Sequence, residues 1–149
     1  MIIQEPGAFV RSLYDLFNTH ATDPQWLEKI VASISDDCDI LDVPSRMMLV
    51  GKEGMQLFLS TWTTAFLDCT FSVTNMVVTE NQVVVEFIGR GTHTGTLYGP
   101  AGEIAPSGHK LVLRYCIVHR IQDDQIVELH IYYDALSLLQ QIGLINEGE

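Results

Sequence analysis

The sequence predicts an α+β domain in which helices cover one face of a mostly antiparallel sheet. Three observations predict it. Apolar residues recur at helical spacing in the first third of the chain, whereas polar and apolar residues alternate with a period of two in the second half. The 149 residues, of which 47% are hydrophobic, suffice for one buried core. We therefore expect residues 1–149 to form a single domain.

Three helices are expected before the sheet. The first has an apolar face made by Phe9, Val10, Leu13, Tyr14, Leu16 and Phe17. Asp23 and Pro24 are typical of a helix start, and the second helix is expected to continue to Ile34. The third begins at Gly51, and its apolar face comprises Met55, Phe58, Leu59, Trp62 and Phe66. Between the second and third, residues 40–43 and 47–50 are expected to pair as a short hairpin.

Four strands are expected in antiparallel succession, at about 70–79, 82–98, 109–121 and 125–134. A longer loop over 99–108 separates the second from the third. A short helix over 135–140 is expected to end the fold before Gly143. A curved sheet closed by helices leaves a concave apolar pocket, which is the usual place for a small ligand.

Composition excludes several classes of function. The net charge is −11 and only eight residues are basic, so neither nucleic acid nor an anionic membrane surface is an expected partner. No apolar run approaches the roughly 18 residues that span a bilayer. The three cysteines lack CxxC spacing and are expected to be reduced thiols of a cytoplasmic protein. The histidines lie too far apart for a local metal motif, so we expect no metal.

Acid–base chemistry remains, and the last expected strand carries candidates for it. Alternation places Glu128, His130, Tyr132 and Asp134 on one face, and Val127, Leu129, Ile131 and Tyr133 on the other. The polar face can line a pocket or simply face solvent, and the pattern alone favours solvent. The apolar face can form the core or a dimer surface.

Further candidates lie outside that strand, and each also has a structural interpretation. Asp42, among apolar neighbours, can act as a general base or cap the turn before Pro44. Tyr14 can donate a hydrogen bond to a ligand or belong to the core. His93 and His119 can transfer protons or be structural. The aromatic residues that can stack on a flat ligand, or fill the core, are Trp62, Phe66, Phe87 and Tyr115.

Several segments together resemble the SnoaL-like polyketide cyclase family. Residues 89–95 (GRGTHTG), Gly99 and residues 106–110 (PSGHK) resemble its GTHTG…G…PTGK run. The family's "aFPD" segment resembles residues 61–68, its "Rf.dGKIvE" segment resembles residues 120–128, and its closing "D…l..QlG" segment resembles residues 134–143. The matches extend from about Asp39 to the C-terminus. The chain departs from the pattern at Leu67, at Asp124-Gln125, and at Ser107 and His109.

The resemblance implies a cone-shaped fold like that of nuclear transport factor 2. It also implies a cyclase without metal or organic cofactor, which closes a ring in a small, apolar, polyketide-like carbonyl compound by an aldol-type reaction. The family's general acid/base matches Asp134, and the Glu128–Asp134 polar face would then point into the pocket. A tyrosine or histidine, among them Tyr14, His93 and His119, would stabilise the enolate oxygen.

A shorter resemblance, to ketosteroid isomerase, implies a different base. LeuAspValPro places Asp42 nine residues before Gly51, and Tyr14 would act as that enzyme's helical donor. An isomerase and a non-catalytic ligand-binding module are therefore alternatives to the cyclase. A homodimer or higher oligomer is also expected, because Val83, Val85 and Phe87 alternate with Val84 and Ile88, and helices can cover only one face of a sheet.

Overall fold

The computed structural model describes residues 5–100 and 102–146, which form helices α1–α4 and strands β1–β8. In chain order the elements are α1 Pro6–Phe17, α2 Trp26–Val31, β1 Ile34–Asp42, β2 Met47–Val50, α3 Gly51–Ala65, β3 Thr70–Val78, β4 Gln82–Thr92, β5 Leu97–Gly99, β6 Gly102–Ile104, β7 Lys110–Gln122, β8 Gln125–Tyr133 and α4 Ala135–Gln141. No helix in this described part is long and apolar enough to cross a membrane.

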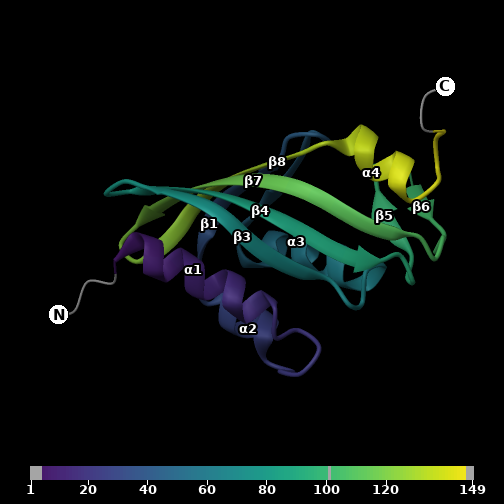
Figure 1. Cartoon of the computed structure of the whole chain (residues 1–149). Coiled ribbons are helices and arrows are strands. Elements are labelled where there is room, and N and C mark those ends of the chain that lie inside the picture. Colours follow the sequence, from purple (N-terminus) through teal and green to yellow (C-terminus); the bar gives the residue numbers. More distant parts are fainter. Residues whose placement is uncertain (1–4, 101, 147–149) are drawn as a thin grey trace.

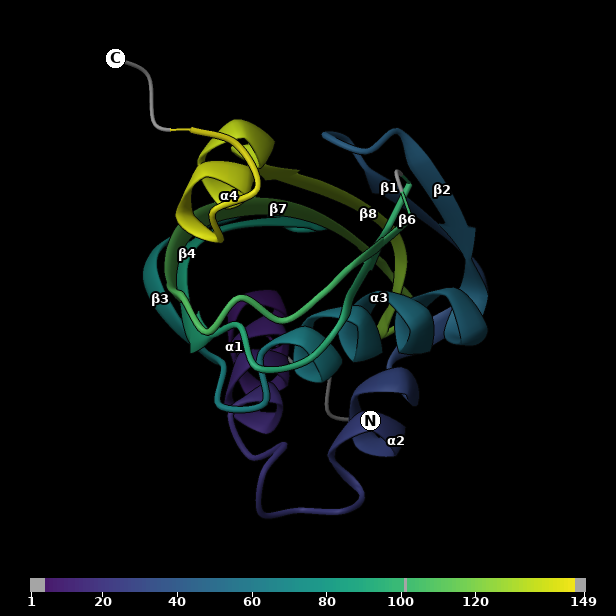
Figure 2. The same cartoon turned by 90° about the vertical axis from the view of Figure 1, so that its right-hand side faces the viewer.

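Six strands form one curved sheet in the order β2-β1-β8-β7-β4-β3, and β5 pairs with β6 in a separate two-stranded sheet. All neighbouring strands of the large sheet are antiparallel except β1 and β8, which are parallel. Helices α1, α2 and α3 lie on one side of the sheet, which arches over α1 and α3 (Figures 1 and 2). The predicted α+β class, with helices over a mostly antiparallel sheet, is confirmed.

The first helix forms as its sequence predicts. The Glu5 carboxylate accepts the backbone N–H groups of Gly7 and Ala8 at 3.0 and 2.8 Å, and Pro6 occupies the first turn, where its missing N–H costs nothing. Its apolar face, with Val10, Leu13 and Phe17 buried, packs toward the concave side of the sheet. This packing begins the core.

Both predicted ends of the second helix were wrong. Helix α2 ends at Val31, and Ile34 instead begins β1, where it pairs with Ile126 of β8. Asp23 does not cap the helix, because its carboxylate accepts the N–H of Gln25 in the preceding turn and pairs with Lys29 at 2.7 Å.

The expected strand 82–98 is also divided. It ends at Thr92, and a bend separates it from β5. The expected loop over 99–108 contains β6, which pairs with β5 through Leu97 opposite Ile104. The predicted hairpin of residues 40–43 and 47–50 forms as β1 and β2, and it joins the four predicted strands in one mixed six-stranded sheet, beside the separate β5–β6 hairpin.

A row of aromatic side chains crosses the concave face. Phe87 of β4, Tyr115 of β7 and Tyr133 of β8 are direct cross-strand partners. The first two rings stack at 4.8 Å between centroids, and the second and third are 5.5 Å apart. Trp62 of α3 meets the Tyr115 and Tyr133 rings edge-on, at 5.5 Å from each. This contact fixes the distance between α3 and the sheet.

Gly95 joins the end of β4 to the end of α3. Its N–H donates to the Ala65 carbonyl at 3.0 Å, and a Cβ at this position would lie 2.0 Å from the carbonyl oxygen of Thr64. Only glycine permits so close an approach between two backbones.

We therefore expect Gly95→Ala to lower the free energy of unfolding by about 1–3 kcal/mol, because the backbone must move apart. Gly99→Ala is the matched control, since a Cβ there meets no atom within 4 Å, and its effect should stay within about 0.5 kcal/mol. Urea unfolding followed by circular dichroism measures both. Equal effects of the two substitutions would contradict the close-approach argument.

Candidate active site

A pocket of about 370 Å³ opens where the β1–β2 turn, α3, the β5–β6 hairpin and α4 meet. We call it the Asp42 pocket. Its lining is mostly apolar and includes Trp62 of α3, Leu97 of β5, Tyr133 of β8 and Leu138 of α4. The pocket is therefore built from elements far apart in sequence, which the curved sheet brings together (Figure 1).

Asp42 is the one carboxylate in this lining, and it is only 8% exposed. Its Oδ2 accepts the hydroxyl of Tyr133 at 3.0 Å, and its Oδ1 accepts the N–H of Ser45 at 3.3 Å. Burial and then the neighbouring Asp42 raise the pKa of Tyr133, so this hydroxyl keeps its proton and remains a donor. Asp42 thus caps the turn and also faces a ligand-sized space, as both interpretations of the sequence proposed.

The remaining polar groups of the Asp42 pocket are neutral. Thr61 and Ser45 contribute hydroxyls, and Tyr98 contributes a half-exposed ring at the mouth. No lysine, arginine or histidine lies among the lining residues. The pocket therefore combines a carboxylate, hydroxyl donors and apolar walls, a set that can move a proton in a partly dry space.

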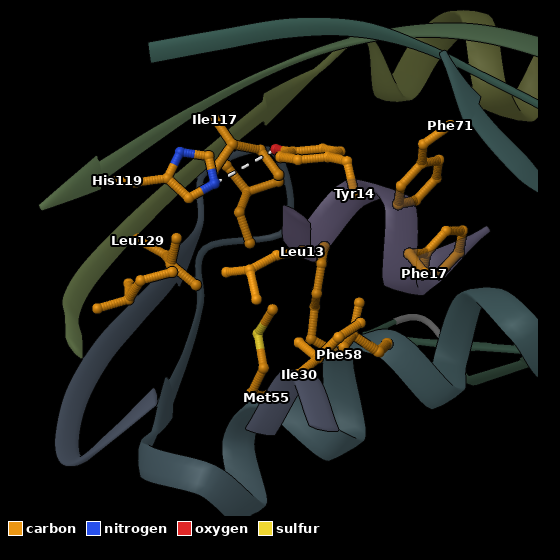
Figure 3. A pocket seen from close by; sticks show the side chains of 13 residues that line it. Leu13, Tyr14, Phe17, Ile30, Met55, Phe58, Phe71, Ile117, His119 and Leu129 are labelled. Atoms are coloured by element: carbon orange, nitrogen blue, oxygen red, sulfur yellow. Dashed lines mark hydrogen bonds between the residues drawn. The ribbon is translucent and has the colours of Figure 1, made fainter. Parts of the chain in front are cut away.

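A second, smaller pocket of about 50 Å³ lies deeper, between α1, α3 and the sheet (Figure 3). We call it the inner pocket. Tyr14 and His119 lie on its wall, with their polar atoms directed toward each other, and Leu13, Met55 and Leu129 contribute apolar side chains. The side chain of Phe58 lines both pockets and stands between them.

Tyr14 and His119 form a buried hydrogen-bonded pair. His119 Nδ1 is 3.0 Å from the Val83 carbonyl oxygen and can only donate to it, so Nε2 accepts the Tyr14 hydroxyl at 3.3 Å. Burial lowers the pKa of His119 to about 4 and raises the pKa of Tyr14. Both groups are therefore neutral near pH 7 and already satisfied by protein partners.

The inward face of the last strand is the opposite of the one that the cyclase resemblance implied. Leu129 and Ile131 are buried and Tyr133 enters the Asp42 pocket, whereas Tyr132 is 43% exposed. His130 lies on the outer face, 3.5 Å from Glu128. The expectation that Glu128, His130 and Tyr132 line the pocket was wrong, because the parity of β8 directs its apolar set toward the helices.

Asp134 follows β8 and is exposed, and it lines neither pocket. Its carboxylate accepts the N–H of Ser137 at 3.0 Å and caps α4, while the next residue, Ala135, does line the Asp42 pocket. Asp134, His119 and Asp42 are thus not brought into one site. Nor does Tyr14 reach Asp42, since it lines only the inner pocket.

Of the four predicted aromatic residues, only Trp62 lines the Asp42 pocket. Phe66, Phe87 and Tyr115 are core residues and line neither pocket. His93 is fully buried against Phe66, and its Nδ1 accepts the N–H of Ser107 at 3.2 Å. These residues build the walls of the cone and do not reach the ligand space.

Sequence reasoning missed Tyr133, which holds Asp42. A signal was present, because Tyr133 shares its parity with Leu129 and Ile131, and an apolar set of this kind usually faces a core. The resemblance overrode that signal. Leu97 and Tyr98 were missed because they were expected to continue a strand over 82–98, whereas the structure places them in β5, in a separate hairpin.

Metal and thiol chemistry find no support among the described residues. No group of three or more histidine, cysteine, aspartate or glutamate side chains is placed to hold a metal ion. Cys69 lies 3.7 Å from His20 Nε2, but burial raises the pKa of its thiol to about 12. A protonated, buried thiol is a poor nucleophile.

Comparison with solved structures shows where this fold occurs. A candidate SnoaL-like polyketide cyclase from a Jannaschia species matches with a TM-score of 0.79 and 19% identity, over 97% of this chain and 99% of that one. IdmH, a candidate polyketide cyclase from Streptomyces antibioticus, matches with a TM-score of 0.73 and 24% identity, over 94% and 99%. These likenesses establish the fold, which the sequence resemblance predicted.

A protein from Catenulispora acidiphila with a ketosteroid isomerase-like fold, in complex with trimethylamine, matches with a TM-score of 0.68 and 14% identity, over 94% and 95%. No curated protein matches the sequence. The model of the SnoaL-like polyketide cyclase family matches residues 10–142, which is most of the chain. The chain therefore belongs to the SnoaL-like polyketide cyclase family.

Proposed function

We propose that this protein is a cyclase without a cofactor, which closes a ring in a small apolar carbonyl compound, and that Asp42 is its general acid/base. The observation that carries the proposal is the position of Asp42. It is the one carboxylate in the lining of either pocket, and it faces a mostly apolar space of about 370 Å³. Family membership supports the reaction class.

The proposed reaction needs one proton to leave and return. The Asp42 carboxylate takes a proton from the carbon next to a carbonyl group, and the resulting enolate carbon attacks a second carbonyl of the same molecule. A carbon–carbon bond forms, and the new alkoxide takes the proton back from Asp42. Neither an oxidant nor a metal is required, and such a proton transfer is typically worth about 10²–10⁴-fold in rate.

Tyr133 holds the carboxylate in place throughout. Its hydroxyl donates to Asp42 Oδ2 and so fixes the position of that oxygen. Trp62 and Leu138 form apolar walls that exclude water from the reacting carbon.

Substitution of Asp42 tests the assignment. Asp42→Asn keeps the shape and the turn-capping oxygen but removes the base, so turnover should fall by about 10²-fold or more with the fold intact. Proton NMR in heavy water measures deuterium exchange next to the carbonyls of small diketones, and the absorbance of a cyclic enone measures ring closure. Asp39→Asn, an exposed carboxylate on the same strand, is the control and should leave both rates unchanged.

Asp134→Asn separates this proposal from the one implied by the sequence resemblance. Asparagine also caps helices well, so α4 should remain intact. A large loss of turnover in Asp134→Asn, with near-normal Asp42→Asn, would overturn Asp42 as the base and favour Asp134.

Ligand binding without turnover is the second candidate function. The Catenulispora acidiphila protein of this fold is in complex with trimethylamine, so a relative of similar structure holds a small molecule. Binding of a small ligand by the parent chain, with proton exchange no faster than in buffer alone, would favour this function over catalysis.

We further propose that His119 is structural and does not exchange protons with a substrate. Its folded-state pKa of about 4 lies below the ordinary value of 6.5, so the unfolded chain binds a proton more readily than the folded chain in that range. The contribution of His119 to the free energy of unfolding is therefore fully present above about pH 6.5. It falls by about 3 kcal/mol in total as the pH decreases through 4.

His119→Gln should remove this part of the acid sensitivity. Urea unfolding at pH 7 and near pH 4.5 gives the loss of stability on acidification, which we expect to be smaller in His119→Gln than in the parent by about 2 kcal/mol. His130→Gln, on the outer face of β8, is the control, and it should lose as much stability on acidification as the parent does. A parent-like loss in His119→Gln would show that the histidine is not held neutral.

We also propose that two copies associate through the outer face of the sheet. Val84, Ile88 and Val118 are half-buried and alternate with the buried residues Val83, Phe87 and Ile117, so they lie on the opposite face, and Tyr132 near them is 43% exposed. Arg120 and Glu128 flank them with charges of both signs, which a two-fold arrangement can pair between copies.

Light scattering at micromolar concentration should therefore give the mass of a dimer or higher oligomer. Val118→Glu should produce monomers, because it places a charge at the centre of the face. Thr70→Glu, at the edge strand β3, should leave the mass unchanged. A monomeric parent chain would refute the association.

A further inference from the structure

The carboxylate of Asp42 is buried without a counter-charge from the protein. Its hydrogen bonds come from two neutral donors, the Tyr133 hydroxyl and the Ser45 N–H. Within the described residues, no lysine, arginine or histidine lies within 4.0 Å of it, since the four ion pairs present there involve Asp23, Asp36 and Glu128. A buried anion of this kind is unfavourable until a cation joins it.

Aromatic rings surround the same space. Phe58, Trp62, Tyr98 and Tyr133 all line the Asp42 pocket. The Trp62 and Tyr133 rings are perpendicular, at 87°, with their centroids 5.5 Å apart, and the Tyr133 hydroxyl bonds the carboxylate. Ring faces attract cations, above all those of tertiary and quaternary ammonium groups, which are large and weakly hydrated.

The charge of the whole chain acts in the same direction. The net charge is −11, which raises the local concentration of cations and lowers that of anions. The pocket itself offers an anionic ligand no basic partner, so an anion would have to lie near Asp42 without compensation.

We propose that the Asp42 pocket selects ligands by charge and binds an ammonium group with an apolar body, its nitrogen near Asp42 and its substituents against the aromatic walls. The inference uses the same pocket as the proposed cyclase but does not depend on turnover. An amine held there occupies the carboxylate that would remove the substrate's proton, so it should inhibit ring closure competitively.

Three probes of matched size test the selection by isothermal titration calorimetry. They are benzyltrimethylammonium, its uncharged carbon isostere neopentylbenzene, and the anion tert-butylbenzoate. We expect the cation to bind at least about tenfold more tightly than the isostere, and the anion more weakly than both. Equal affinity for cation and isostere, or tighter binding of the anion, would overturn the proposal without any variant being made.

Substitution of Asp42 then tests whether this residue causes the preference for the cation. Asp42→Asn should lower the affinity for the cation at least tenfold, to about that of the isostere, and leave the affinity for the isostere unchanged. Asp39→Asn removes an equal charge from the exposed side of β1 and should change neither affinity. Equal losses in the two variants would assign the preference to the overall charge of the chain and contradict a charge-selective pocket.

The outcome is separable from that of the proposed function. A preference for the cation together with unchanged proton exchange in Asp42→Asn would support the binding site and refute catalysis by Asp42. Loss of proton exchange in Asp42→Asn without a preference for the cation would support catalysis by Asp42 and refute the ammonium-binding site.

Discussion

The row of rings Phe87, Tyr115 and Tyr133 is the contact on which the interior of this protein depends. Because the three are cross-strand partners, their side chains must leave the sheet on the same side. Trp62 meets two of them and holds α3 at a fixed height above the sheet. The last ring of the row also donates to Asp42, so one arrangement sets both the depth of the cone and the position of its carboxylate.

Most strand positions were predictable, whereas the inward face was predictable for some strands only. Alternation located β3, β7 and β8 to within one residue and grouped Leu129, Ile131 and Tyr133 correctly, but β4 ends at Thr92, six residues before its expected end. Both faces of β4 carry apolar residues, however, so in that strand the pattern cannot say which set meets the helices. The parallel pairing of β1 with β8 was missed for a related reason, because it depends on contacts between segments about ninety residues apart.

The candidate site was predictable in part. Asp42 drew attention as an acid among apolar neighbours, and Trp62 as part of a helix face. Their proximity to Tyr133 is a tertiary contact, and no spacing in the local sequence predicts it. Asp134 shows the opposite case, because its place in a motif suggested chemistry, and its carboxylate caps a helix in the structure. The local role of a polar residue is thus readable only once its backbone partners are known.

The β5–β6 hairpin has its own hydrogen-bond ladder, separate from that of the large sheet. Displacing it therefore breaks no backbone bond of the strands that carry Asp42 and Tyr133. The main cost is the exposure of Leu97, which is 5% exposed in place, or about 2 kcal/mol. An opening confined to this hairpin would cost far less than global unfolding. It would admit a molecule to the pocket while the geometry of the acid and its tyrosine persists.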